Sequence, residues 1–226
     1  MRIGILGTGV VGQTLAEALA NKGHEVTIGT RAPQETLART EADMYGRPPF
    51  RVWHEQHPSV AFGTLAEAAA NAEVVVNAIT GGGSLEGLKA AGEANLAGKV
   101  LLDVANPLDF SHGMPPSLFV CNTDSLAEQI QAAFPTARVV KSLNTMTASV
   151  MVDPKSLAGG DHTVFVSGNE AEAKATVSEL LRELGWTDIL DLGDLTSARG
   201  AEMVLTIWVS IMGALQTPRS NIKIVR

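Results

Sequence analysis

A glycine-rich turn close to the N-terminus constrains the fold of this chain more than any other feature. Gly7, Gly9 and Gly12 follow the apolar run 2–6 and precede an Ala-rich stretch with helical periodicity. This context is typical of a strand, turn and helix that bind a dinucleotide, although a glycine-rich turn without a ligand is the alternative. Gly7 permits a tight turn, Gly9 lets the backbone approach a pyrophosphate, and Gly12 allows close packing of helix on strand. The phosphates would lie on free N–H groups at the helix start.

Short apolar runs alternate with helical stretches along the whole 226 residues. The expected strands are 2–6, 25–29, 60–62, 74–79, 100–104, 138–143, 163–166 and 187–192, with the tail 222–225 as one more. The expected helices are 10–21, 64–71, 125–134, 170–184 and 197–216. This alternation predicts an α/β fold: a Rossmann-type, doubly wound, mostly parallel sheet with a C-terminal α/β extension. We expect a single NAD(P)-binding Rossmann domain over 1–226, with a nucleotide-binding core at 1–143 and the extension at 144–226.

Two stretches fit no regular element in the sequence. The segment from Met44 to Pro58 contains three prolines and two histidines, and it is interpreted as an inserted surface loop. The segment from Asn106 to Cys121 contains three prolines. Long loops inside a compact α/β domain are often functional, so both segments are candidates for contact with a ligand.

Composition excludes several classes of function. The net charge is −7, which argues against nucleic acid as a partner. The single cysteine, Cys121, rules out an intramolecular disulfide and is interpreted as a small buried apolar residue. We see no stretch near the ~20 apolar residues of a membrane helix and no signal peptide at the N-terminus. A cytoplasmic protein without a membrane partner is therefore expected.

The end of the second strand indicates which nucleotide binds. An NAD site usually carries Asp or Glu there, whereas this chain has Thr30 and Arg31. Arg31 can form charge-assisted hydrogen bonds with a 2′-phosphate, and Thr30 adds a hydroxyl donor. The sequence thus predicts NADP over NAD. The alternative is that Arg31 is a solvated loop residue.

Three further strand ends carry small or amide side chains at the edge where ligands bind in such sheets. The first runs from Asn77 through Thr80 into Gly81, Gly82 and Gly83, which would form either a close cofactor contact or a flexible turn. The second is Asn106 and Pro107, where the amide could hold the nicotinamide side. The third begins at Asn144, which would contact substrate or cap the following helix.

No nucleophile, general acid or general base is evident, so we assign no catalytic side chain. His54 and His57 could share one helical turn, but no third ligand accompanies them, and we expect no metal site. Hydride transfer between two rings depends on positioning more than on proton transfer. The lack of acid–base residues is therefore compatible with redox chemistry.

Several segments carry a resemblance to a known family. They are the turn at 7–12, the run 23–26 before Thr30 and Arg31, and the segments 139–145, 164–169 and 197–199. With these segments the chain resembles the deazaflavin-dependent NADP oxidoreductases, which exchange hydride between NADP and coenzyme F-420. The later segments are also similar to the cytosolic reductase domain of STEAP-type metalloreductases. Those proteins pass electrons from NADPH to flavin and then to a membrane haem.

The resemblance implies roles for individual residues. Thr8 to Val11 would hold the pyrophosphate, Thr30 and Arg31 the 2′-phosphate, and the segments 78–79 and 144–145 would flank the nicotinamide and the acceptor ring. Glu35 lies where the archaeal members carry a second basic residue, so that cation would move to Arg39 or Arg51. The expected cofactor-binding residues are Gly7, Thr8, Gly9, Val10, Val11, Gly12, Thr30, Arg31, Asn77, Ala78, Ile79, Asn106 and Pro107, and the expected substrate-binding residues are Asn144, Thr145 and Met146.

We therefore expect an NADP(H)-dependent oxidoreductase whose acceptor is a flat ring such as coenzyme F-420 or a flavin. The alternatives are an NADPH-dependent flavin, quinone or ferric reductase and a non-catalytic NADP sensor. The last expected helix, 197–216, is apolar on more than one face. Such a helix is buried, either by the core or by a second subunit, and we favour a homodimer.

Overall fold

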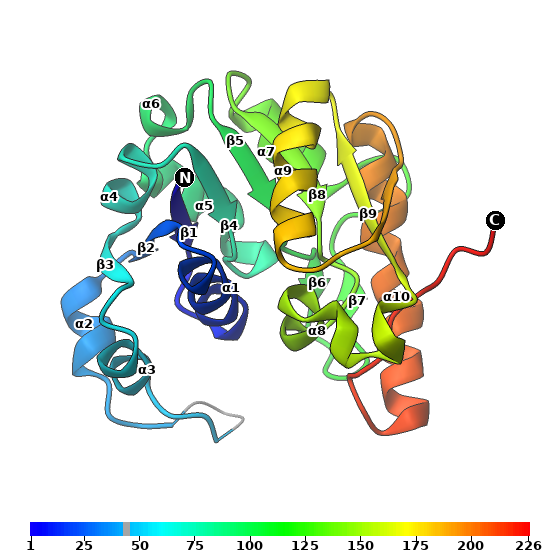
Figure 1. Cartoon of the computed structure of the whole chain (residues 1–226), viewed down its shortest axis with the longest axis horizontal. Helices are drawn as coiled ribbons and strands as arrows, with labels where there is room; N and C mark the ends of the chain where they lie inside the picture. Colours follow the sequence, from blue (N-terminus) through cyan, green and yellow to red (C-terminus); the bar gives the residue numbers. More distant parts are fainter. Residues whose placement is uncertain (43–45) are drawn as a thin grey trace.

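A computed structural model describes residues 1–42 and 46–226, and its main feature is one eight-stranded sheet in the order β10-β9-β8-β5-β4-β1-β2-β3 (Figure 1). The strands of this sheet are β1 Arg2–Leu6, β2 Glu25–Thr30, β3 Ala61–Thr64, β4 Val74–Asn77, β5 Val100–Asp103, β8 Arg138–Ser142, β9 Thr163–Gly168 and β10 Asp188–Asp191. All neighbouring strands are parallel except β8 and β9. The predicted Rossmann-type, mostly parallel sheet is confirmed.

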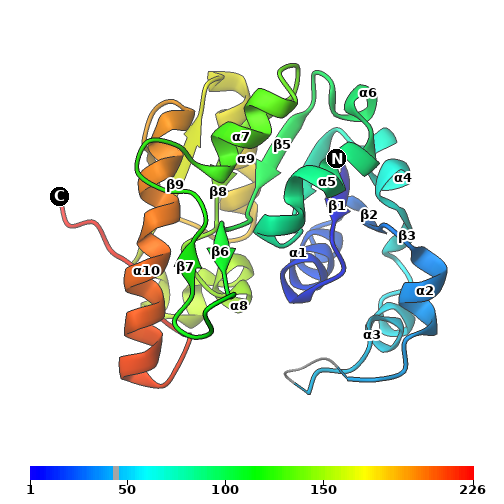
Figure 2. The same ribbon diagram turned by 180° about the vertical axis from the view of Figure 1, so that it is seen from behind.

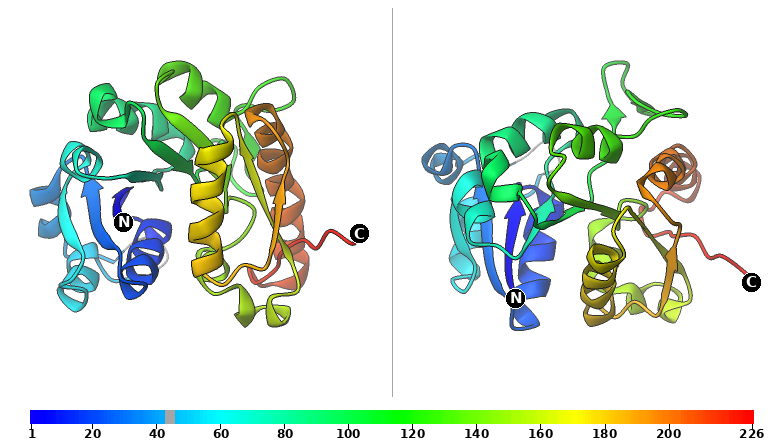
Figure 3. Two further views of the ribbon diagram at one scale, coloured as in Figure 1. Left: turned by 45° about the horizontal axis from the view of Figure 1, so that its top comes forward. Right: turned by 90° about the horizontal axis from the view of Figure 1, so that it is seen from above.

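Helices cover both faces of the sheet because its central strands are apolar on both sides. Val74 and Val76 point into one core and Val75 into the other, as the period of two in a strand requires. The helices are α1 Val10–Asn21, α2 Pro33–Ala38, α3 Phe50–Gln56, α4 Leu65–Ala70, α5 Gly81–Ala91, α6 Glu93–Leu96, α7 Leu126–Ala133, α8 Ala148–Val152, α9 Ala171–Glu183 and α10 Ala198–Leu215. Helices α1, α8 and α9 pack on the first core, and α4, α5 and α7 pack on the second (Figures 2 and 3).

Local capping explains where several helices begin. Thr64 and Glu67 form a capping box at α4, in which the side chain of each accepts a backbone N–H of the other. Ser125 accepts the N–H of Glu128 at the start of α7. Both starts agree with the sequence prediction.

The expected surface loop at 44–58 is wrong in part, because α3 lies within it; Met44 itself lies outside the described residues. Phe50 is buried in the same core as α1, and its ring lies 5.5 Å from the ring of Trp53. Trp53 in turn stacks on His57 at 4.4 Å. This aromatic contact gives a short helix an apolar face that the irregular sequence did not suggest.

Three other expectations need correction. Gly81 to Gly83 form the first turn of α5 instead of a flexible turn. Position 81 requires glycine, because a Cβ there would lie 2.0 Å from the carbonyl oxygen of Asn106. The tail 222–225 forms no strand; it lies beside β9, where the N–H of Thr163 donates to the carbonyl of Ile222 at 2.9 Å. Cys121 is exposed, because it follows a small hairpin that projects from the core, β6 Leu108–Asp109 with β7 Ser117–Leu118.

Helix α10 is only partly buried within this chain. Its buried residues are Ala198, Ala201, Glu202, Leu205 and Val209, whereas Ile207 and Leu215 are 52% and 61% exposed. Contrary to the sequence expectation, the helical stretch Leu195–Leu215 is long and apolar enough to cross a membrane by length and composition, with 28% of its apolar window buried. A core helix of a soluble protein passes the same test.

Candidate functional site

The turn between β1 and α1 has the shape that its three glycines predict. Gly7 adopts φ +118°, a conformation that favours glycine. A Cβ on Gly12 would lie 1.9 Å from the carbonyl oxygen of Gly7, so helix and strand pack closely there. Nothing lies within 4 Å of a Cβ built on Gly9, and the start of α1 has no side-chain cap. Free N–H groups therefore face open space, which suits a phosphate.

A cavity of about 250 Å³ continues from this turn across the carboxyl ends of β1, β2 and β4. Its lining comprises Gly7, Thr8, Gly9, Thr30, Arg31, Thr36, Arg39, Leu65, Ala78, Ile79, Thr80, Gly83 and Gly87. The structure thus brings together the glycine turn, the Thr30–Arg31 pair and the end of β4, as the sequence suggested. No Asp or Glu is among the described residues that line this cavity.

The cations around this cavity suit a 2′-phosphate. Arg31 and Arg39 both line it, and both are exposed at the surface. Thr30 and Thr36 also line it, and their hydroxyl groups lie 3.3 Å apart. Arg51 lines neither this cavity nor its neighbour, so of the two alternatives for a second cation the geometry favours Arg39.

A larger cavity of about 890 Å³ adjoins the glycine turn on the side of α1. Thr8, Gly9 and Val10 form one wall, and Phe50 and Trp53 of α3 contribute to the opposite wall. The insertion therefore faces the phosphate turn directly. Among the other expected cofactor residues, Val11 is half-buried, whereas Gly12, Asn77 and Pro107 are buried.

Asn77 shapes the end of β4 from within the protein. It is fully buried, and its amide nitrogen donates to Asp103 at 2.8 Å and to Ser84 at 3.0 Å. Its amide oxygen accepts the N–H of Ile79 at 3.3 Å. The side chain thus fixes the backbone that lines the 250 Å³ cavity.

Asn106 and Asn144 are bonded to each other across two strand ends. The Asn106 amide donates to the Asn144 carbonyl at 2.8 Å, and the Asn144 amide donates to Asn106 Oδ1 at 2.9 Å and to the Ala201 carbonyl at 3.0 Å. Leu143, directly before Asn144, has φ +62°, a strained conformation that is enriched at functional sites. The capping alternative for Asn144 is wrong, because Thr147 is the residue that precedes α8.

Asn144, Thr145 and Met146 are 2%, 1% and 5% exposed. Their side chains lie under the surface of the strand end, so their contact with a substrate stays a prediction.

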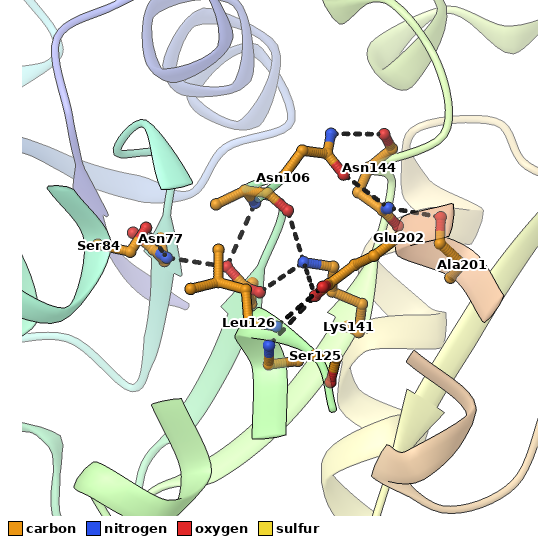
Figure 4. Close-up of polar contacts among 12 residues, drawn as sticks. Asn77, Ser84, Asn106, Ser125, Leu126, Lys141, Asn144, Ala201 and Glu202 are labelled. Atoms are coloured by element: carbon orange, nitrogen blue, oxygen red, sulfur yellow. Dashed lines mark hydrogen bonds and ion pairs between the residues drawn. The ribbon is translucent and has the colours of Figure 1, made fainter. Parts of the chain in front are cut away.

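The sequence analysis missed a group of three buried charged residues, Asp103, Lys141 and Glu202, which we call the buried charge cluster. Lys141 and Glu202 are labelled in Figure 4. Lys141 Nζ lies 2.7 Å from Asp103 Oδ2 and 2.9 Å from Glu202 Oε1, and it donates to the Ala105 carbonyl. Burial alone would lower the pKa of Lys141, but the two carboxylates outweigh burial and raise its pKa above the usual value. Lysine stays an ammonium ion in this setting.

Neither histidine of the insertion has a metal-site arrangement. His57 Nδ1 contacts the carbonyl of Trp53 at 2.6 Å, and His57 Nε2 lies 3.4 Å from Glu17. In the part of the chain that the structure describes, no group of three or more His, Cys, Asp or Glu side chains could hold a metal ion.

Comparison with known proteins finds relatives that are named as NADP reductases or metalloreductases. The family described as "NADP oxidoreductase coenzyme F420-dependent" matches residues 2–107. The F420-dependent NADP reductase of Methanothermobacter marburgensis is 27% identical over 215 residues, which cover 93% of this chain and 92% of that protein. Metalloreductase STEAP3 of Rattus norvegicus is 31% identical over 204 residues, or 90% of this chain, but the match spans only 36% of that protein.

A solved structure extends this relationship over the full length. The crystal structure of a candidate F420-dependent NADP reductase from Arthrobacter sp. FB24 is 61% identical, covers 100% of both chains and superposes with a TM-score of 0.96. The sheet, the glycine turn and the sequence relationships lead to one assignment. This chain belongs to the coenzyme F420-dependent NADP oxidoreductase family.

Proposed function

We propose that this protein is an NADP(H)-dependent oxidoreductase that transfers a hydride between nicotinamide and a flat acceptor ring, with the deazaflavin coenzyme F420 as the acceptor. The observation that carries the proposal is the 250 Å³ cavity, which joins an uncapped helix start to Thr30 and Arg31 without a lining carboxylate. The names of the relatives support the choice of acceptor.

The residues of this chain bind and orient the cofactor; none acts as an acid or base in the proposal. The N–H groups from Thr8 to Val11 hold the pyrophosphate, and Thr30, Arg31 and Arg39 hold the 2′-phosphate. The side chains of Asn77, which is buried, and Asn106, which is half-buried, fix the strand ends on the nicotinamide side. When bound, NADPH supplies the hydride, so the protein needs to position two rings and exclude water.

The test is rapid-mixing oxidation of NADPH with coenzyme F420, FMN, FAD and a quinone as separate acceptors. We expect fast loss of NADPH absorbance with the deazaflavin and slow loss with the others. Fast oxidation with FMN or FAD alone would replace the deazaflavin with a flavin. Tight NADP binding without oxidation by any acceptor would instead support a sensor.

A second candidate function is an NADPH-dependent flavin or ferric reductase. The match to STEAP3 across 90% of this chain favours it. The same acceptor series separates it from the first candidate.

We also propose that the chain forms a single Rossmann domain, with a nucleotide-binding core at 1–143 and an extension at 144–226. We further propose that two copies of the chain form a homodimer. The exposed apolar side chains Ile207 and Leu215 of α10 support a partner surface, and α10 lies beside the β6–β7 hairpin, where Phe110 and Phe119 are exposed. The partner would be a second copy of the chain in the cytoplasm, without membrane or nucleic acid. The net charge of −7 supports the last point.

A further inference from the structure

We propose that the buried charge cluster of Asp103, Lys141 and Glu202 makes the protein favour the oxidised, cationic nicotinamide over the reduced, neutral one. The inference rests on the proposed function, because it takes NADP as the ligand. The three side chains touch no ligand in this proposal; they act through their charge on a ring at the strand ends above them.

The contacts of the cluster indicate a net charge of −1. Asp103 accepts the Asn77 amide, the N–H of Ala105 at 3.2 Å and the Lys141 ammonium. In each of these hydrogen bonds the partner donates to the Asp103 carboxylate, so none of them requires a proton on the carboxylate.

Glu202 has the same kind of surroundings. It accepts the N–H groups of Leu126 and Ala127, at 2.8 and 3.1 Å, as well as the Lys141 ammonium. Two carboxylates therefore face one ammonium ion, and all three side chains are at most 2% exposed.

Two members of the cluster, Asp103 and Lys141, lie in one row across the sheet below the predicted nicotinamide side, and Glu202 reaches them from α10. Asn77, Asp103 and Lys141 are register partners on β4, β5 and β8. Asp103 precedes Asn106 by three residues and Lys141 precedes Asn144 by three, a length of at most about 10 Å of chain. The phosphate turn and the Thr30–Arg31 pair occupy β1 and β2, so the other half of a dinucleotide extends toward β5 and β8.

The charge of the ring depends on its redox state. Reduction adds a hydride, which is two electrons and one proton, and removes the positive charge of the nicotinamide. A net negative charge below the ring stabilises the cationic form and leaves the neutral form almost unchanged. At about 10 Å and an effective dielectric constant of about 20, one unit charge changes the ratio of the two affinities by roughly tenfold.

The same three residues also link β5 and β8 to the starts of α7 and α10. A purely structural role must therefore be separated from an electrostatic one. Loss of structure at the strand ends weakens both nucleotides together. Loss of one negative charge weakens NADP⁺ relative to NADPH. The ratio of the two dissociation constants therefore distinguishes the roles.

The experiment titrates NADP⁺ and NADPH separately into the full chain by calorimetry. Glu202→Gln and Asp103→Asn each remove one negative charge from the cluster on opposite sides of Lys141. We expect the ratio of the NADP⁺ to the NADPH dissociation constant to rise about tenfold in both variants. Glu172→Gln is the matched control, because the Glu172 side chain is 93% exposed on α9, and its ratio should equal that of the unmodified protein.

Circular dichroism checks that each variant is folded. If one variant does not fold, the dissociation constants of the other variant are sufficient for the test. An unchanged or lower ratio in a folded variant overturns the proposal. If the unmodified protein binds neither nucleotide, the proposed function falls with it. If the ratio rises but no acceptor oxidises NADPH, the inference stands and the proposed function fails.

Discussion

At the scale of single residues, Arg31 carries the choice between two nucleotides that differ by one phosphate. It lines the cavity beside Thr30 and has no carboxylate beside it among the described lining residues. A guanidinium ion can hold a phosphate with two parallel hydrogen bonds, which a solvated loop arginine would not do.

Replacing Arg31 with Ala should reduce the preference for NADPH over NADH by about 10- to 100-fold, because one charge-assisted contact contributes roughly 1.5–3 kcal/mol. Equilibrium titration of both nucleotides measures the ratio. Arg51→Ala is the control, because Arg51 is exposed and lines neither cavity. An unchanged ratio in Arg31→Ala would refute the assignment.

Removal of Lys141 should destabilise the fold, because its ammonium group faces two buried carboxylates. In Lys141→Met two buried carboxylates lose their ammonium partner, which should lower the free energy of unfolding by about 3–5 kcal/mol. Urea unfolding measures the difference from the unmodified protein. Lys89→Met, at an exposed pair with Glu86, should change it by less than about 1 kcal/mol.

The pH dependence of this difference has a defined sign. The pKa of Lys141 is raised above 10.5, so its stabilising contribution is complete below the unfolded-state pKa and is lost as pH rises through the folded-state pKa. The difference between the two proteins should therefore stay constant from about pH 7 to pH 9. A decline within that range would show that Lys141 is neutral in the folded state.

At the scale of elements, the start of α7 shows how a helix end becomes part of a site. Two of its free N–H groups, those of Leu126 and Ala127, bond to Glu202 from α10, and the third, that of Glu128, bonds to Ser125. A helix start favours negative charge, so Glu202 is stabilised by the helix as well as by Lys141.

Ser125→Ala removes one of these acceptors and should lower the free energy of unfolding by about 1 kcal/mol. Thermal and urea unfolding both measure it. Thr176→Ala, within α9, is a control expected to be neutral or slightly stabilising, because alanine favours helix interiors. If the two variants were equally stable, the cap would contribute nothing.

At the scale of the whole molecule, the sequence predicted the sheet well because its central strands are unbroken apolar runs. It missed α5, since three successive glycines disfavour a helix, and in the structure Gly81 is needed for the close approach to Asn106. It missed α3 because the contacts that hold the helix are long-range: the ring of Phe50 contacts that of Phe62 on β3, and Phe50 lies in the same core as α1.

The candidate site also has one part that could be predicted from the sequence and one part that could not. The phosphate turn was predictable because its backbone geometry depends on glycines that lie close together in the sequence. The buried charge cluster was not assembled from the sequence, since its members are separated by 38 and 61 residues. A signal was nevertheless present: Asp103 ends an apolar strand, Lys141 follows two valines in β8, and Glu202 lies in the mainly apolar helix α10.

The exposed face of α10 leads to a prediction about assembly. Ile207→Lys places a charge on the exposed part of α10 that a second copy would cover. We expect a dimer for the unmodified chain and a monomer for the variant in size-exclusion chromatography with light scattering. If the unmodified chain and the variant were both monomers, a second copy of the chain would not be the partner of this surface.

The positions of the three tryptophans have a practical consequence. Trp53 lines the 890 Å³ cavity beside the phosphate turn, Trp186 is 2% exposed in the core, and Trp208 on α10 donates to the Ser220 carbonyl. Each indole thus samples a different event: nucleotide entry, unfolding or assembly. The chain carries its own fluorescent reporters, and single Trp→Phe variants would assign each optical change to one part of the molecule without an added dye.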